Sequence, residues 1–342
     1  MKALIAYGPG DLRLVEKDVP SYGPGDVLIR VKACGVCHTD LIIVNGGFRN
    51  YGFPNVIGHE FGGLAEECGS SVTHVKKGDK VTVNTLGSCG CCRFCHMGEY
   101  HKCGAVRSVG INLEGGFQEF ISLPASFVYK IPDTMSFEEA AMVEPAANAY
   151  GIVDQAHAGI GDNVAVVGPG AIGLVAVNVS KLRQPGLLIA VGTRRERLET
   201  AKALGATHAV NIRDCDPYEE VMRLTEGRGA DVVYWCGGER DAWDLSRNIL
   251  GVFGKLLVEA IPASWDAEWN VRIDDFNNRM HTIIGARGYT PRQYEETIEL
   301  IRAGHLDVKS LVTHRYAIED YKEAFAAGRD RRDGAIKVMI VM

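Results

Sequence analysis

The sequence predicts an α/β protein that combines a β-rich part with a doubly wound parallel sheet, and three observations support this fold class. From Met1 to about Phe127, short β-like runs are separated by Gly and Pro, which is typical of a β-rich domain. From Asn163 onwards, strand-like and amphipathic segments alternate, as in a parallel sheet with helical crossovers. The motif G-x-G-x-x-G follows the first of these later strands directly.

The individual elements follow from local patterns. Strands are expected at 1–7 and at 26–33, where apolar and polar residues alternate after a Gly-Pro-Gly turn. Ser136 and Glu139 form a capping box that predicts a helix start, and a second helix is expected around 146–156. The parallel sheet is expected to use strands at 163–167, 187–191, 208–211, 231–235, 255–259 and 282–286, with helices at 171–181, 196–203 and 218–225.

The last part of the chain predicts a return to the first domain. Thr290-Pro291 is expected to cap a helix that runs to Ala303, with Gly304 as its stop. The tail from residue 311 is expected to form strand, helix and strand. We therefore expect a discontinuous domain of residues 1–150 and 288–342, and a dinucleotide-binding domain of residues 151–287.

Composition excludes several classes of partner. The chain has 342 residues, 46% of them hydrophobic and 23% charged, and its net charge of −6 argues against nucleic acid or an anionic membrane. No apolar run approaches the roughly 18 residues that span a bilayer, and the N-terminus has no signal-peptide pattern. The expected compartment is the cytoplasm. In that reducing environment, clustered cysteines indicate metal binding rather than disulfides.

The glycine motif predicts a dinucleotide site. Gly168 permits a tight turn, Gly170 lets the backbone approach a pyrophosphate, and Gly173 lets the helix pack closely on the sheet. The helix N-terminus at Ala171 and Ile172 offers free N–H groups to the phosphates. An ordinary glycine turn is the alternative, but the surrounding strand and helix pattern favours a cofactor site.

Residues after the next strand indicate which dinucleotide is bound. Gly192 stands where an acidic residue would bind the ribose hydroxyls of NAD, and Thr193, Arg194 and Arg195 follow it. No carboxylate is there to repel a 2′-phosphate, and the arginines can pair with one. NADP is therefore favoured over NAD, although the arginines could instead be a solvated helix start.

Four cysteines in one loop predict a structural zinc site. Cys89, Cys92, Cys95 and Cys103 have the spacing C-x₂-C-x₂-C-x₇-C, which can close a tetrahedral shell with no open position. Cys91 is out of register and is expected to be a free thiol. Iron–sulfur ligation is the alternative for the four cysteines, and the nearby residues His96 and His101 are expected to lie at the surface.

A second, dispersed group is compatible with an open metal site. Cys37 follows the strand at 26–33, His59 follows about twenty residues later, and Glu144 lies in the helical linker. A thiolate, an imidazole and a carboxylate can hold Zn²⁺ with one position left for water or substrate. Each residue alone would more often be a packing or hydrogen-bonded residue.

Taken together, these motifs resemble those of the zinc-containing medium-chain dehydrogenase/reductase family, and the resemblance covers nearly the full length of the chain. The resemblance rests on these segments: Gly35–Asp40, Gly58–Glu60, the four-cysteine loop, Gly115–Phe117 and the fingerprint from Gly168 to Gly173. It implies a GroES-like β-rich catalytic domain and a Rossmann domain. It also implies two zinc ions per chain, one catalytic and one structural.

The resemblance assigns roles to matching residues. Cys37 and His59 would be catalytic zinc ligands, Thr39 would hydrogen-bond the substrate hydroxyl, and Asp40 would orient His59. His38 would lie near the cofactor phosphates. The pair Glu144-Pro145 resembles the sorbitol, glucose and related polyol or sugar dehydrogenases, whereas simple alcohol dehydrogenases tend to have cysteine there. In that branch Glu60 can ligate zinc directly, so Glu60 and Glu144 both remain candidates for the third ligand.

The chain departs from many relatives at one point. A proton-relay histidine often follows the Thr-Asp pair, but Leu41, Ile42 and Ile43 occupy this stretch. Any proton released from the substrate would have to leave through Thr39, Glu144 or water.

The resemblance implies a zinc-dependent oxidoreductase that moves a hydride between a secondary alcohol, polyol or sugar hydroxyl and NAD(P). Alternatives are a dehydrogenase of simple alcohols or of 3-hydroxy amino acids such as threonine, and an NADPH-binding structural protein with a degenerate site. A zinc-independent reductase or lyase on this fold would lack Cys37, His59 and Glu144 together. Members of the family are usually homodimers or homotetramers, and the same is expected here.

Overall fold

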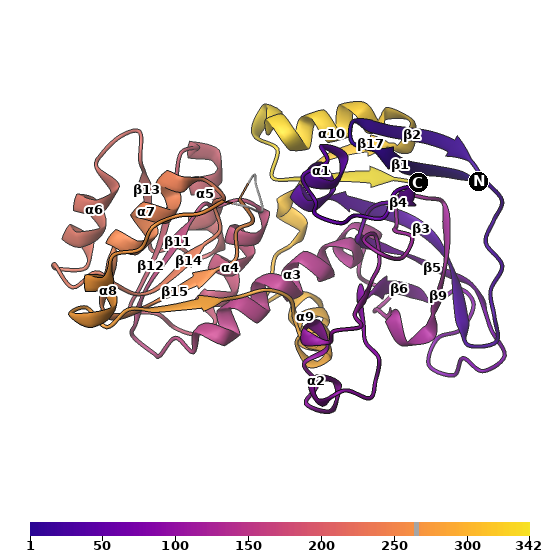
Figure 1. Ribbon diagram of the computed structural model, residues 1–342, viewed down its shortest axis with the longest axis horizontal. Helices are drawn as coiled ribbons and strands as arrows, with labels where there is room; N and C mark the ends of the chain where they lie inside the picture. Colours follow the sequence, from indigo (N-terminus) through magenta and orange to yellow (C-terminus); the bar gives the residue numbers. More distant parts are fainter. Residues whose placement is uncertain (263–266) are drawn as a thin grey trace. The chain divides into compact units, whose positions relative to one another are not determined.

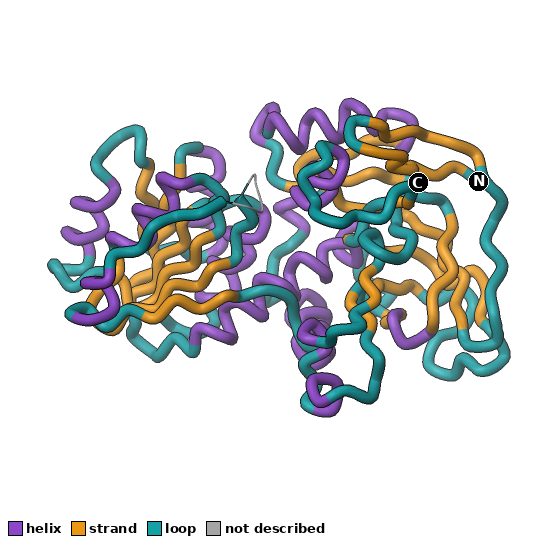
Figure 2. Tube along the Cα trace, in the orientation of Figure 1, coloured by secondary structure: helices purple, strands orange, loops and turns teal. Residues whose placement is uncertain are grey.

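Two kinds of sheet organise the described residues, 1–262 and 267–342, of the computed structural model (Figures 1 and 2). Contacts divide the chain into two compact units. Unit 1 comprises Met1–Pro145 and Tyr289–Met342, and unit 2 comprises Ala146–Gly288. Among these described residues, no helix is long and apolar enough to cross a membrane.

Unit 2 contains a six-stranded sheet in which every pair of neighbours is parallel, in the order β13-β12-β11-β14-β15-β16. The strands are β11 (Asn163–Val167), β12 (Leu187–Gly192), β13 (His208–Asn211), β14 (Ala230–Trp235), β15 (Leu250–Val258) and β16 (Thr282–Gly285). The order places the first strand beside both the second and the fourth, which is the doubly wound arrangement of dinucleotide-binding folds. The prediction of a doubly wound parallel sheet is confirmed.

The helices of unit 2 connect these parallel strands. They are α4 (Ala171–Lys181), α5 (Arg195–Leu204), α6 (Pro217–Leu224), α7 (Arg240–Asn248) and α8 (Ile273–Asn277). Strand β15 begins at Leu250, five residues before the predicted start. A register irregularity between Ala230 and Val232 lets this earlier segment pair with β14.

Unit 1 is built mainly on antiparallel strands, and only β17 and β18 pair in parallel among the described strands of its two larger sheets. A three-stranded sheet has the order β2-β1-β4, and the larger sheet has the order β10-β6-β5-β3-β18-β17 with β9 also paired to β3. The bounds are β1 (Lys2–Gly8), β2 (Asp11–Glu16), β3 (Asp26–Val36), β4 (Asn55–Val56), β5 (Glu60–Cys68), β6 (Lys80–Val83), β9 (Phe120–Pro124), β10 (Val128–Lys130), β17 (Val312–Ala317) and β18 (Lys337–Val341). Apolar residues from these strands, including Leu4, Ile29 and Phe61, form the buried core.

The C-terminal segment joins the sheet of unit 1. Strand β18 pairs antiparallel with β3, so that Val338 lies opposite Val36 and Ile340 lies opposite Cys34. Helix α10 (Tyr321–Asp330) connects β17 to β18. The last strand is therefore placed beside the strand that leads to Cys37.

One long helix, α3 (Phe137–Ala156), replaces the two helices expected before the parallel sheet. Its start is capped as predicted, because Glu139 N–H donates to Ser136 Oγ at 3.2 Å and Ser136 N–H donates to Glu139 at 2.8 Å. The prediction of two separate helices is wrong, because the helix continues through Pro145 without a break. Buried apolar residues on both sides of the proline, such as Met142 and Ala147, keep the whole segment packed.

Candidate metal and dinucleotide sites

Cys37, His59 and Glu60 come together in unit 1. Cys37 follows β3 at the start of helix α1 (His38–Val44), whereas His59 and Glu60 stand at the start of β5. Their potential ligand atoms all lie within 4.8 Å of one another. Four-coordinate zinc with sulfur and nitrogen bonds of about 2.3 and 2.0 Å holds its ligand atoms at such separations. The group therefore fits a zinc ion.

A glycine makes the bend that brings His59 into this group. Gly58 has φ +95°, and a Cβ there would meet Phe117 at 2.7 Å and the Cys34 sulfur at 2.9 Å. Both the backbone conformation and the lack of space exclude a side chain. The motif Gly58-His59-Glu60 thus has a conformational cause as well as a chemical one.

Asp40 contacts both Cys37 and His59. Its Oδ2 accepts the N–H of Cys37 at 2.9 Å, and its Oδ1 lies 3.6 Å from His59 Nδ1. Asp40 is fully buried. A carboxylate on one imidazole nitrogen leaves the other nitrogen for a metal, which is the common arrangement around metal-bound histidines.

Glu60 has a second partner that the sequence did not reveal. Lys337 Nζ donates to Glu60 Oε2 at 2.5 Å and to the carbonyl oxygen of Val36 at 3.4 Å. The relative exposures of Glu60 and Lys337 are 1% and 4%, so this is a buried ion pair. The only sequence signal was a single charge at the start of an apolar terminal strand.

Glu144 lies near this group but outside it. Its carboxylate accepts a hydrogen bond from Tyr289 Oη at 3.2 Å, and Thr85 Oγ1 lies 3.3 Å from the same hydroxyl. Burial raises the pKa of Glu144 to about 7, with a further contribution from the charge of Glu60. The third ligand atom of the group with Cys37 and His59 therefore comes from Glu60 and not from Glu144.

The balance of charges favours a cation. Burial lowers the pKa of His59, but the charges of Cys37 and Asp40 outweigh burial and raise it well above its ordinary value. Burial also acts against a charged Lys337, yet Glu60 and Cys37 raise the pKa of this lysine overall. Because acidic groups outnumber bases here, the site stabilises positive charge, as a divalent ion would require.

The remaining α1 residues have different exposures. Thr39 is half-buried and His38 is exposed, while Leu41, Ile42 and Ile43 are buried. The buried apolar stretch offers no group that could carry a proton. This agrees with the absence of a relay histidine in the sequence.

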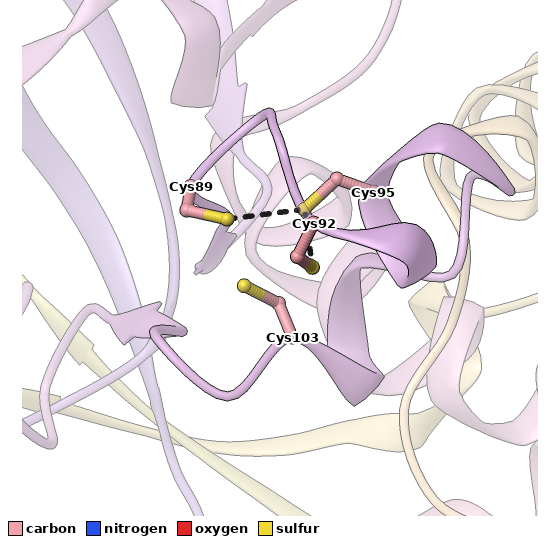
Figure 3. A group of neighbouring side chains, drawn as sticks. All are labelled: Cys89, Cys92, Cys95 and Cys103. Carbon is pink, nitrogen blue, oxygen red and sulfur yellow. Dashed lines mark hydrogen bonds between the residues drawn. The ribbon is translucent and has the colours of Figure 1, made fainter.

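The four cysteines of the loop converge on one point (Figure 3). Cys89 Sγ lies 3.8 Å from Cys95 Sγ, and Cys92 Sγ lies 3.4 Å from Cys95 Sγ. Cys103 points toward the other three from the opposite side. All four sulfurs lie within 4.8 Å of one another, which matches the edges of a tetrahedral Zn–S₄ shell of about 3.8 Å.

The loop also prepares a thiolate. The backbone N–H groups of Cys91 and Cys92 lower the pKa of Cys89 to about 6. Cys91 itself is exposed and is not a member of the four-sulfur group. His101 lies 3.4 Å from Glu99 and also stands outside the group.

The glycine fingerprint in unit 2 forms a cradle at the end of β11. A Cβ at Gly168 would meet the backbone of Gly237 at 2.5 Å, and one at Gly173 would meet the carbonyl oxygen of Gly168 at 2.4 Å. A Cβ at Gly170 would find only Arg197 Nη1, at 3.9 Å. The space beside Gly170 is thus open at the N-terminus of α4, where an anionic pyrophosphate can approach the free N–H groups.

The last residue of β12, Gly192, leaves no room for the usual acid. A Cβ at Gly192 would meet the Pro169 ring at 2.7 Å. Arg194 precedes α5, and Arg195 pairs with Asp214 at 3.1 Å on the surface. Thr193 stands between Gly192 and these arginines. The position at the end of β12 therefore carries no carboxylate, and two arginines follow it, of which Arg195 is paired with Asp214.

Comparisons with known proteins agree with the two units. Residues 23–133 match the alcohol dehydrogenase GroES-like domain, and residues 171–303 match the zinc-binding dehydrogenase domain. A sorbitol dehydrogenase of Bacillus subtilis (strain 168) is 33% identical over 344 residues, which cover 99% of this chain and 97% of that protein. An L-threonine 3-dehydrogenase of Bacillus licheniformis is 33% identical over 348 residues and 98% of both chains.

A solved structure has the same fold over its whole length. The zinc-binding dehydrogenase from Sinorhizobium meliloti 1021, crystallised with NADP, aligns with a TM-score of 0.93. It is 26% identical in sequence, and the alignment covers 100% of this chain and 99% of that one. This structural similarity also covers the residues that lie outside the two family matches.

These matches define a zinc-binding dehydrogenase built from a GroES-like domain and a Rossmann sheet. The chain belongs to the zinc-containing medium-chain dehydrogenase/reductase family.

Proposed function

We propose that this dehydrogenase oxidises a secondary alcohol of a polyol or sugar with NADP as the hydride acceptor. The observation that carries the proposal is the buried group of Cys37, His59 and Glu60, which fits zinc and leaves a coordination position open. The sorbitol dehydrogenases among the relatives and the acid Glu144 at the linker position support a polyol substrate.

In this proposal residues 1–150 and 288–342 form the catalytic domain, and residues 151–287 bind the dinucleotide. Cys37, His59 and Glu60 hold the catalytic zinc, and Cys89, Cys92, Cys95 and Cys103 hold a structural one. Glu60 is favoured over Glu144 as third ligand because only its carboxylate lies within 4.8 Å of the other two ligand atoms. Glu144, held by Tyr289, is then available to a substrate hydroxyl or to water.

Zinc bound at the first group would supply a Lewis acid that favours loss of the proton from a substrate hydroxyl. Asp40 fixes the imidazole of His59 and the backbone of Cys37. Thr39, half-buried in the first turn of α1, hydrogen-bonds the hydroxyl, and the proton leaves through Thr39, Glu144 or water. A bound dinucleotide would supply the hydride acceptor, and oxidation of the carbon that carries this hydroxyl would yield a carbonyl and one proton.

The dinucleotide site favours NADP in this proposal. The backbone at Gly168, Gly170, Ala171, Ile172 and Gly173 receives the pyrophosphate, with His38 as an additional phosphate contact. Gly192 excludes an acid, and Thr193, Arg194 and Arg195 face a 2′-phosphate with hydroxyl and guanidinium donors. The NADP bound to the Sinorhizobium meliloti protein supports this choice.

Two general properties complete the proposal. The chain forms a homodimer or homotetramer, since unit 2 has an edge strand, β16, and exposed apolar side chains such as Ile273, Phe253 and Met280. It acts in the cytoplasm, because a zinc site of four thiolates requires reduced cysteines, which a reducing compartment maintains.

A substrate screen tests the function. Oxidation of sorbitol-like polyols, sugars, simple alcohols and L-threonine would be followed with NAD and NADP in parallel, with Cys37→Ser as the inactive control. We expect the highest kcat/KM for a polyol with NADP and no turnover by C37S. Activity of C37S equal to the unaltered protein, or no oxidation of any alcohol, would contradict the proposal.

L-threonine is the second candidate substrate. Several relatives that cover 98% of this chain are L-threonine 3-dehydrogenases, at 32–33% identity. Threonine also presents a secondary alcohol, so the same zinc group and Thr39 would serve it. A kcat/KM for L-threonine above that of every polyol would select this candidate.

A further inference from the structure

An acidic side chain, Glu259, follows directly after the carboxyl end of β15. Leu256 and Leu257 are buried in the sheet, and Glu259 follows immediately after Val258. Its backbone N–H donates to the carbonyl oxygen of Trp235 at 3.3 Å, which ties it to the end of β14. An acid at this end of a parallel strand faces the edge where such sheets bind ligands.

The carboxylate of Glu259 is held in place by a defined partner. Asn148 Nδ2 donates to Glu259 Oε1 at 2.6 Å, and Asn148 Oδ1 accepts the N–H of Gly288 at 2.8 Å. The amide of Asn148 is therefore oriented at both ends. This fixes the position of the negative charge and not only its presence.

Strand order places this charge relative to the dinucleotide cradle. Gly168 follows the end of β11, Cys236 and Gly237 follow the end of its neighbour β14, and β15 is the next strand. Gly237 packs against Gly168, and burial together with the charge of Glu259 raises the pKa of Cys236 far above its ordinary value. Neighbouring strands lie about 4.8 Å apart, so Glu259 stands about 10 Å from the fingerprint.

In doubly wound sheets of this kind, each half of the sheet binds one half of a dinucleotide. The adenosine half belongs to the side of β12, where the ribose-binding residue follows the strand. The nicotinamide half then belongs to the side of β14 and β15, at a distance that a ribose and a nicotinamide ring can span. Glu259 and Asn148 lie on that side.

We propose that the carboxylate of Glu259, oriented by Asn148, makes the dinucleotide site bind the oxidised cofactor more tightly than the reduced one. This rests on the dinucleotide site of the proposed function. The oxidised nicotinamide ring carries a positive charge and the reduced ring is neutral, so a fixed nearby carboxylate stabilises only the oxidised form. The side of the sheet formed by β14 and β15 thereby favours binding of the oxidised dinucleotide and release of the reduced dinucleotide.

The test compares two affinities in four full-length proteins. Dissociation constants for NADP⁺ and NADPH would be measured by calorimetry for the unaltered protein, Glu259→Gln, Glu259→Asp and Glu219→Gln. Glu219 is exposed on α6 and gives the same change of net charge at a remote place in unit 2.

We expect Glu259→Gln to weaken NADP⁺ binding about tenfold, equivalent to about 1.4 kcal/mol, and to change NADPH binding less than twofold. Glu259→Asp keeps the charge and should keep most of the preference, and Glu219→Gln should keep all of it. If E259Q does not fold, the nearly isosteric Glu259→Met gives the same comparison, and E259D should still bind NADP⁺ preferentially.

Equal weakening of both forms, or no change in either, would overturn the inference and leave the proposed cofactor site intact. Failure of the unaltered protein to bind either form would refute the proposed function itself.

Discussion

Replacing Lys337 by methionine tests the buried pair that closes the candidate zinc site. Lys337 and Glu60 are almost fully buried and their charged atoms lie 2.5 Å apart. Removing one partner of such a pair leaves an uncompensated charge and costs about 3–5 kcal/mol, whereas replacing both by neutral groups costs much less. We therefore expect Lys337→Met to destabilise metal-free unit 1 by about 3–5 kcal/mol.

The double variant separates charge from packing. Lys337→Met with Glu60→Gln should recover at least about 2 kcal/mol of the loss, since no buried charge remains. Zinc should also recover part of the loss in Lys337→Met, because a cation at Cys37, His59 and Glu60 replaces the ammonium as counter-charge.

Two signals allow each unit to be followed during urea unfolding. All four tryptophans lie between residues 235 and 269, so their fluorescence reports on unit 2, while far-UV circular dichroism follows both units. The midpoint of the unit 2 signal should not move in these variants. The reasoning would be refuted if Lys337→Met lost less than about 1 kcal/mol in the free energy of unfolding. It would also be refuted if the loss in the double variant equalled the sum of the losses in the two single variants.

Three further predictions address other sites. Cys103→Ser should remove one zinc per chain and lower the melting temperature, whereas Cys91→Ser should keep full zinc content by atomic absorption, because Cys91 stands outside the four-sulfur group. Equal zinc loss in both would argue against the four-cysteine assignment. In metal-free protein, unit 1 should lose on the order of 3 kcal/mol as pH rises from 4.5 to about 7, since the raised pKa of Glu144 keeps it protonated when folded while the unfolded chain releases the proton. Urea midpoints of Glu144→Gln should lack this part of the pH dependence, and an unchanged profile would contradict it. Gly170→Ala should fold normally but weaken dinucleotide binding at least tenfold in calorimetry, whereas Gly173→Ala should also lower the melting temperature, because its Cβ would meet Gly168 oxygen at 2.4 Å. Normal dinucleotide affinity in Gly170→Ala would show that the pyrophosphate does not approach there.

Local patterns predicted the features that local chemistry determines. The fingerprint from Gly168 to Gly173 and the loop from Cys89 to Cys103 are contiguous, so spacing alone indicated the turn and the cluster of sulfurs. The parallel sheet was predictable because each buried strand is an apolar run of limited length.

Long-range pairing determined what the sequence could not show. Lys337 and Glu60 are separated by 277 positions, and only the antiparallel pairing of β18 with β3 places the lysine beside this site. The continuous helix α3 was missed for the opposite reason. Pro145 is a strong local signal for a break, but burial of residues on both sides of it prevails.

Zinc content and dinucleotide affinity of Cys37→Ser, measured on the same preparation, test the central claim most directly. The unaltered protein should contain two zinc ions per chain. Cys37→Ser should contain one, show no alcohol oxidation and bind NADP with unchanged affinity, because Cys37 lies in unit 1 and the fingerprint lies in unit 2. Two zinc ions and full activity in Cys37→Ser would contradict the account.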